Sequence, residues 1–331
     1  MFYLVMKFKG LLLVLVIGLI CSAFLLSSSS VIRVKAQSGP LQNSLQVQGL
    51  GIDPFLFELD MSAGQSTTQT ITLINTTNKP LSFQASIHDF VPQGNTGQPR
   101  FLSSSEESDS KYSLSRWITI IKQPEFTLPP QAKTEITFAI NIPANVEPGT
   151  HYGGILFGQP ISQIEGSSSA AEQKAGAIIL VRLGRSNEQI SIENFASNKK
   201  IYSHGPVEFT TTLHNFGNVH SRPKGEVTVR NIWGRQVTQL PVNKDALIVL
   251  PESKRVFPTE WSNKLGFGRY TAEEVLFYGS PKVELRAQTS FWILPLKEIV
   301  LGSIIALIFA IISYILIRRY NRYIINRAKH G

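Results

Sequence analysis

The sequence predicts an all-β protein: two tandem immunoglobulin-like β-sandwich domains, with an N-terminal signal segment and one C-terminal transmembrane helix. Three observations support this fold class. Uncharged apolar runs of membrane length occur only near the two ends of the 331-residue chain. The stretch between them alternates apolar and polar residues over short segments. Two parts of that stretch repeat the same turn and strand motifs in the same order.

The N-terminal segment has the residue order of a secretory signal. Two lysines precede an uncharged apolar run at residues 10–26, and a polar stretch then ends in the small-residue cleavage site V-K-A at 34–36. We therefore predict a signal peptide over residues 1–36. The alternative is an uncleaved N-terminal anchor. It would place Arg33 and Lys35 outside the membrane, against the positive-inside rule.

A second apolar run lies near the C-terminus. Residues 299–317 contain no charged side chain. As a helix they would be about 28 Å long, which matches one hydrocarbon core. The basic segment 318–331 follows without any acidic residue. We predict a single transmembrane helix over 299–317, a basic cytoplasmic tail over 318–331, and an extracellular domain on the N-terminal side.

The formal charge of +9 lies entirely in the two end segments. Residues 37–298 contain 23 basic and 23 acidic residues and are formally neutral. A nucleic-acid-binding domain needs a net basic face, so we expect no nucleic-acid partner. The only cysteine, Cys21, lies in the N-terminal apolar run. The folded part therefore has no disulfide, thiolate metal site or cysteine nucleophile.

The central stretch alternates at the period of a β-strand. Residues 70–73, 81–87, 136–142 and 207–213 place apolar side chains at every second position and are rich in β-branched residues. Asn, Gly and Pro turns separate these segments. We predict strands at all four positions and a further strand over 176–183.

The two halves of this stretch are related to each other. Leu73-Ile74-Asn75 and Leu213-His214-Asn215 each close a strand and open an Asn-rich turn, and we align the later Leu128-Pro129 with Leu250-Pro251. The interval from Asn to Leu-Pro is longer in the first half, which contains the polar, Ser-rich segment 92–116. Coincidental similarity between two generic β domains is the alternative interpretation.

These repeats give the domain boundaries. The first predicted sandwich covers residues 45–186 and carries two long loops, 92–116 and 159–175. The second predicted sandwich covers residues 188–293.

The chain contains no catalytic motif that we can recognise, so we predict a protein that is not an enzyme and needs no cofactor or metal. Glu273 and Glu274 are adjacent in a predicted strand and would point to opposite faces, so they cannot act as a carboxylate pair. The aromatic residues around them, Phe267, Tyr270, Phe277 and Tyr278, are interpreted as core.

Three aromatic residues bracket the long loop of the first domain. A loop with embedded aromatic side chains on a rigid sandwich is a typical ligand-binding surface. We therefore predict Phe101, Tyr112 and Trp117 as ligand-binding residues. The alternative is that these side chains only anchor the loop.

The order of parts resembles the WxL-interacting proteins of Gram-positive cell surfaces. The resemblance is carried by Leu73–Pro80, by the turn at 128–130, and by Glu147–Phe157 with its H-Y-G-G-I-L-F strand. In that family the first extracellular domain is described as peptidoglycan-binding, and the second binds a host or partner ligand. The resemblance implies no catalytic residue.

These features predict a non-enzymatic, single-pass protein of the cell membrane, acting in adhesion or scaffolding at the cell envelope. The resemblance implies cell-wall glycan, or a surface protein, as its partner. The alternative function is that of an accessory subunit of a membrane transport or secretion complex, in which the helix and basic tail would dock to the complex.

Overall fold

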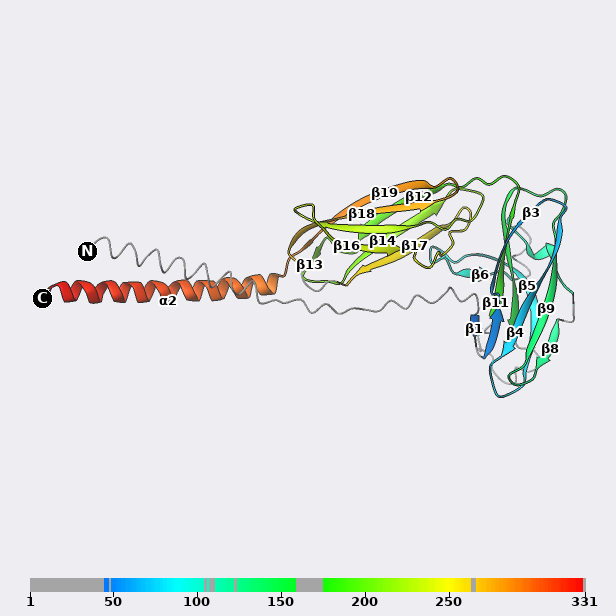
Figure 1. The fold of residues 1–331 in the computed structure, drawn as a ribbon, viewed down its shortest axis with the longest axis horizontal. Helices are drawn as coiled ribbons and strands as arrows, with labels where there is room; N and C mark the ends of the chain where they lie inside the picture. The colour runs from blue at the N-terminus through cyan, green and yellow to red at the C-terminus, as the bar shows by residue number, and fades with distance from the viewer. Residues whose placement is uncertain are drawn as a thin grey trace. The chain divides into compact units, whose positions relative to one another are not determined.

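The computed structural model describes residues 45–47, 49–103, 106, 111–121, 124–158, 175–262 and 266–329. The predicted signal peptide and nearly all of the predicted loop 159–175 lie outside these residues. Within them, the chain consists of β-strands, one short 3-10 helix (η1) and one apolar C-terminal helix (Figure 1). The mostly-β class and the apolar C-terminal helix are therefore confirmed.

Residues 45–183, the first β region, form two sheets. In one, the strand order is β1-β2-β4-β9-β7; in the other it is β3-β11-β10-β5-β6, with β8 also paired to β5. Their bounds are β1 Leu45–Val47, β2 Leu50–Asp53, β3 Leu56–Met61, β4 Ser66–Asn75, β5 Leu81–Pro92, β6 Pro99–Phe101, η1 Ser115–Trp117, β7 Ile118–Ile120, β8 Glu125–Leu128, β9 Lys133–Asn141, β10 Gly149–Gly158 and β11 Ala175–Leu183.

Residues 190–293, the second β region, also form two sheets. The strand orders are β12-β14-β17 and β13-β19-β18-β15-β16 (Figure 1). Their bounds are β12 Ile190–Ser197, β13 Ile201–Tyr202, β14 Val207–Asn215, β15 Lys224–Asn231, β16 Gln236–Val242, β17 Lys254–Trp261, β18 Gly268–Tyr278 and β19 Val283–Ile293.

The two β regions pair their strands in a corresponding order. The antiparallel ladder β2-β4-β9 of the first region corresponds to β12-β14-β17 of the second. The ladder β3-β11-β10-β5 corresponds to β13-β19-β18-β15, and in both the first pair is parallel and the others antiparallel. The strands predicted over 70–73, 81–87, 136–142, 176–183 and 207–213 are all present, in β4, β5, β9, β11 and β14.

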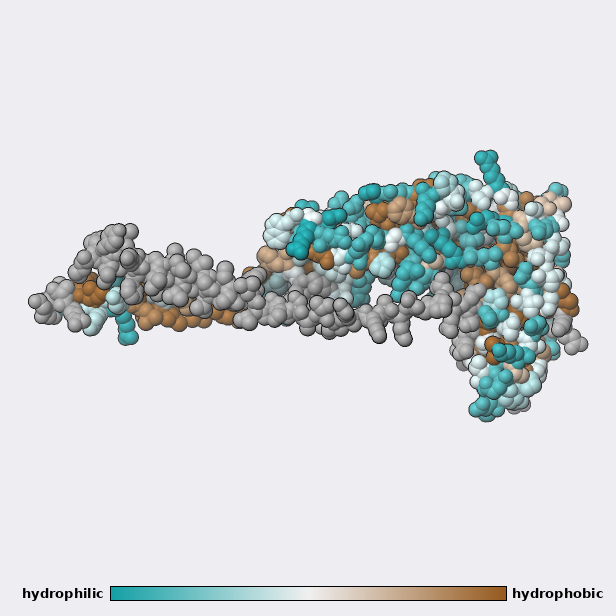
Figure 2. Space-filling view, in the orientation of Figure 1, coloured by the Kyte–Doolittle hydropathy of each residue, from teal (hydrophilic) through white to brown (hydrophobic). Residues whose placement is uncertain are grey.

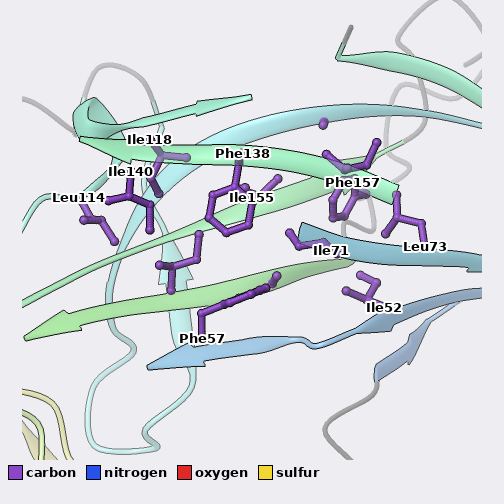
Figure 3. Close-up of a cluster of buried hydrophobic side chains, with 14 of the residues drawn as sticks. Ile52, Phe57, Ile71, Leu73, Leu114, Ile118, Phe138, Ile140, Ile155 and Phe157 are labelled. Atoms are coloured by element: carbon purple, nitrogen blue, oxygen red, sulfur yellow. The ribbon is translucent and has the colours of Figure 1, made fainter. Parts of the chain in front are cut away.

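Each region has its own apolar core, because alternate residues of its strands face inward. In the first, Ile71, Phe138 and Phe157 point into the space between strands, and Phe57 meets Phe138 edge to face at 5.3 Å (Figure 3). In the second, Phe291 stacks on Tyr270 at a centroid distance of 5.7 Å. Burial of each such side chain contributes about 1.5–3 kcal/mol.

Helix α2 covers Leu296–Lys329 and has 34 residues. It includes the predicted span 299–317 and continues through most of the predicted basic tail. Among the described residues it is the one helix long and apolar enough to cross a membrane, with a mean hydropathy of 2.8 in its most apolar window. Figure 2 shows hydrophobic residues along its visible surface.

Candidate functional site

The predicted ligand-binding residues Phe101 and Tyr112 are linked by two further aromatic rings. Strand β6 pairs with β5, which places Phe101 opposite Phe90, with their rings edge to face at 5.6 Å. Phe90 lies 5.0 Å from the ring of Tyr152, and Tyr152 stacks on Tyr112 at 5.7 Å. The predicted loop 92–116 thus contains a short strand and folds back onto the sheet.

The third predicted residue, Trp117, joins the same series of rings through His151. The ring of Trp117 lies 4.6 Å from that of His151, which lies 6.3 Å from Tyr112. We call Phe101, Phe90, Tyr152, Tyr112, His151 and Trp117 the aromatic row. Its inner members are buried, whereas Phe101 and Trp117 at its two ends are partly exposed. Burial raises the pKa of the Tyr152 hydroxyl well above its usual range.

Gly154 of β10 makes room for the loop. A Cβ at Gly154 would lie 2.7 Å from a ring carbon of Phe101, whereas one at Gly153 would lie 3.2 Å from the backbone O of His88 in the neighbouring strand. The ring of Phe101 therefore occupies the space that a side chain at Gly154 would otherwise fill. These contacts give a physical reason for the H-Y-G-G sequence at 151–154.

Asp89 fastens the end of the loop to the sheet. Its buried carboxylate accepts hydrogen bonds from Ser113 Oγ at 2.5 Å, Leu114 N at 2.9 Å, and Ser115 N and Oγ at 2.8 and 2.9 Å. The ring nitrogens of His151 lie 3.3 Å from Ser113 O and 3.0 Å from Glu147 O. The hydrogen bonds to the Asp89 carboxylate are charge-assisted, and together they hold residues 113–115 in one conformation.

A second candidate surface is a charged hollow of about 360 Å³ that is lined by Glu58, Asp60, Arg182, His220 and Arg222 among others. Glu58 accepts a hydrogen bond from Arg222 at 2.6 Å and lies 3.0 Å from His220 Nε2. Hydrogen bonds from His220 and then Arg222 lower the pKa of Glu58 to about 2.

One buried nitrogen in the hollow is close to a carboxylate but makes no hydrogen bond with the described residues. Arg182 Nε is buried and has no hydrogen-bond partner within the described part of the chain; Asp60 Oδ1 lies 3.6 Å away. Among all the residues that the structure describes, no group of three or more His, Cys, Asp or Glu side chains could hold a metal ion. The hollow therefore offers donors and acceptors for a small polar group.

Residues 53–159 match the sequence model described as "WxL Interacting Protein, peptidoglycan binding domain". Over these residues the chain is similar to the WxL-interacting protein family. The resemblance expected from the sequence is confirmed, and the matched segment contains Asp89 and the whole aromatic row.

Solved structures with similar strand arrangements include several chaperones. The class 5 fimbriae chaperone CfaA is 14% identical, with 73% of this chain and 98% of that chain covered and a TM-score of 0.36. The CupB2 chaperone of Pseudomonas aeruginosa is 11% identical, with 71% and 97% covered and a TM-score of 0.34. The E. coli chaperone DraB is 13% identical, with 72% and 95% covered and a TM-score of 0.32. No curated protein gives a significant match. Similarity at these scores is too distant to assign a function.

The structure brings the three predicted residues Phe101, Tyr112 and Trp117 into one row; their role in ligand binding stays a prediction. Sequence reasoning missed Asp89, Phe90, His151 and Tyr152. The two glycines after Tyr152 were the available signal, because adjacent glycines in an apolar strand often mark a close approach by another segment.

Proposed function

We propose that this protein is a non-enzymatic, membrane-anchored cell-surface protein that binds peptidoglycan through its first β region and acts in adhesion or scaffolding at the cell envelope. The observation that carries the proposal is the family match over residues 53–159. The two β regions would be tandem immunoglobulin-like domains outside the cell. Helix α2 would cross the membrane and leave the basic C-terminal end in the cytoplasm.

Within the first β region, the glycan would contact the two ends of the aromatic row. Phe101 and Trp117 are partly exposed and lie at the two ends of the aromatic row, so a sugar could lie against either ring. Tyr112 is buried beneath them. It would act by holding the row in place through its stacking on Tyr152.

The proposal can be tested by co-sedimentation. The full-length protein, solubilised in detergent, is mixed with purified peptidoglycan sacculi and pelleted. We expect the wild-type protein to bind and the Trp117→Ala and Phe101→Ala variants to bind about tenfold more weakly, since loss of an aromatic contact costs roughly 1–1.5 kcal/mol.

The matched control is Phe216→Ala, which removes an exposed aromatic ring outside the matched segment and should leave binding unchanged. Circular dichroism checks that each variant is folded. Wild-type protein that pellets no more than an unrelated single-pass protein in the same detergent would overturn peptidoglycan binding and leave a surface protein as the remaining partner.

A further inference from the structure

The β15–β16 turn exposes two large apolar side chains. Trp233 is 82% exposed and Ile232 is 61% exposed. The turn is well defined, because Asn231 Oδ1 accepts hydrogen bonds from Trp233 N at 3.1 Å and Arg235 N at 3.0 Å, and Gly234 N donates to Asn231 O at 2.9 Å. Neither side chain belongs to the buried core of the second β region or to the partly buried residues described as packed against it.

Sheet register brings this turn to the end of the second β region where α2 begins. Asn231 pairs with Tyr270, and Tyr270 pairs with Phe291, two residues before the end of β19. Asn231 therefore lies about two strand spacings, roughly 10 Å, from Phe291. Only Leu294 and Pro295 separate β19 from α2.

Three more exposed apolar residues lie at the same end. Phe267 is 64% exposed and precedes Gly268, which pairs with Ile293. Trp292 points outward from β19, and Ile201 of β13 pairs with it. We call Ile201, Ile232, Trp233, Phe267 and Trp292 the apolar end.

Exposed charges at this end are mainly basic. The exposed basic residues are Lys199, Lys200, Arg230, Arg235 and Arg269, and the exposed acidic residues near them are Glu208 and Glu260. Lys200 O accepts a hydrogen bond from Trp292 N at 2.9 Å, and Arg230 donates to Gly234 O at 3.3 Å, so these two residues are fixed beside the apolar side chains.

We propose that the apolar end of the second β region inserts into the headgroup layer of the membrane that α2 crosses, and that its basic residues bind anionic lipid. The two linking residues and the first turn of α2 reach at most about 15 Å from Ile293 to the start of the predicted span at Ile299. The headgroup layer is roughly 5–8 Å thick. Once the helix is inserted, the end of β19 therefore lies no more than about 10 Å beyond the outer edge of this layer.

Exposed tryptophan with flanking basic residues is the side-chain chemistry of the membrane interface, where the indole ring lies among headgroups and basic side chains are attracted to anionic lipid. The contact would hold the second β region against the bilayer surface and restrict its rotation about the two-residue linker to α2. The inference rests on the membrane anchor of the proposed function.

Spin labelling of the full-length chain tests the contact. The single cysteine is removed by Cys21→Ser, and nitroxide labels are placed by Trp233→Cys, by Phe277→Cys at the opposite end of β18, and by Ile308→Cys within α2. Each protein is reconstituted in vesicles of phosphatidylcholine with phosphatidylglycerol and in vesicles of phosphatidylcholine alone. Collision with a water-soluble nickel complex then reports the exposure of each label to water.

We expect the label at 233 to collide with nickel several-fold less often than the label at 277, and the label at 308 to be fully protected. A label at 233 as exposed as that at 277, with 308 protected, overturns the inference and leaves the anchor intact. A label at 308 that collides freely overturns the anchor and the inference with it. Equal protection of 233 in both kinds of vesicle retains the apolar contact and overturns the binding of anionic lipid.

Discussion

The two β regions share a pattern of strand pairing, yet each stabilises a buried carboxylate differently. In the first region, Asp89 accepts four hydrogen bonds, two of them from backbone N–H groups. In the second, Glu274 is fully buried and receives one hydrogen bond, from Thr211 Oγ1 at 2.6 Å, while its Oε2 has no partner among the described residues. Burial raises the pKa of Glu274 to about 7.

This difference follows from the number of hydrogen-bond donors that can reach each carboxylate. Asp89 lies beneath the loop of the first region and supplies acceptors for backbone that leaves the strand ladder. Glu274 lies between two sheets whose backbone groups are already paired, so few donors can reach it. A buried carboxylate is stabilised either by fixed donors or by protonation, and this protein contains both solutions.

The largest expected effect comes from removing the acceptor in the first region. Asp89→Ala leaves two backbone N–H groups and two hydroxyls without their partner. We expect a loss of about 3–5 kcal/mol in the stability of this region. Hydrogen exchange of the full-length protein, followed by mass spectrometry, reports the loss separately for peptides of β5 and β10.

Asp89→Asn is the matched variant, since it keeps the shape and one acceptor oxygen. It should lose less stability than Asp89→Ala. A loss below about 1 kcal/mol for Asp89→Ala would show that the aromatic row, and not the carboxylate, holds the loop.

A smaller effect is expected at the turn that both regions share. Asn75 Nδ2 donates to Lys79 O at 2.8 Å and Leu128 O at 3.1 Å, and Asn215 Nδ2 donates to Val219 O at 2.8 Å and Val249 O at 3.1 Å. Both side chains are fully buried. Asn75→Ala and Asn215→Ala should each cost about 2–3 kcal/mol, measured by hydrogen exchange in their own region.

Equal losses would show that the two turns are energetically equivalent. A loss confined to one region would mean that the other turn is held mainly by its apolar neighbours, and it would weaken the interpretation of the two regions as copies of one unit.

These turns also show what the sequence could predict. Alternation and β-branched residues predicted the strands, and the Leu-x-Asn motif marked two turns with matching Asn hydrogen bonds, because both signals reflect local geometry. The alignment of Leu128-Pro129 with Leu250-Pro251 was wrong by one residue. The structure aligns Leu128 with Val249, since their carbonyls accept the equivalent Asn hydrogen bonds. It also aligns Gln131 with Glu252, the residues with positive φ.

Contacts between residues far apart in the sequence could not be predicted in this way. The partners of Asp89 lie 24–26 positions away in the sequence, and no motif marks such a spacing.

The interpretation of Phe267 and Phe277 as core residues was wrong, because both are exposed. Phe277 and Tyr278 are neighbours in a strand, so only one of them can face the core. The prediction that Glu273 and Glu274 face opposite sides is confirmed, since Glu273 pairs with Arg286 at the surface.

The smallest expected effect is a change of stability with pH in the second region. The pKa of Glu274 is about 7 in the folded protein, against 4.5 for the free side chain. Its contribution is therefore fully present below pH 4.5 and is lost as the pH rises through 7. Between pH 6 and pH 8 the second region should lose about 1 kcal/mol of stability.

Glu274→Gln should abolish this slope, because the amide keeps the hydrogen bond from Thr211 and cannot ionise. Glu273→Gln is the matched control, one residue away on the exposed face, and should keep the slope. Hydrogen exchange of β18 peptides in the full-length protein, with rates corrected for the intrinsic effect of pH, measures all three. If the stability of Glu274→Gln and that of the wild type depend on pH equally, the second carboxylate oxygen of Glu274 must accept a hydrogen bond in the folded protein. The two regions would then stabilise their buried carboxylates in the same way.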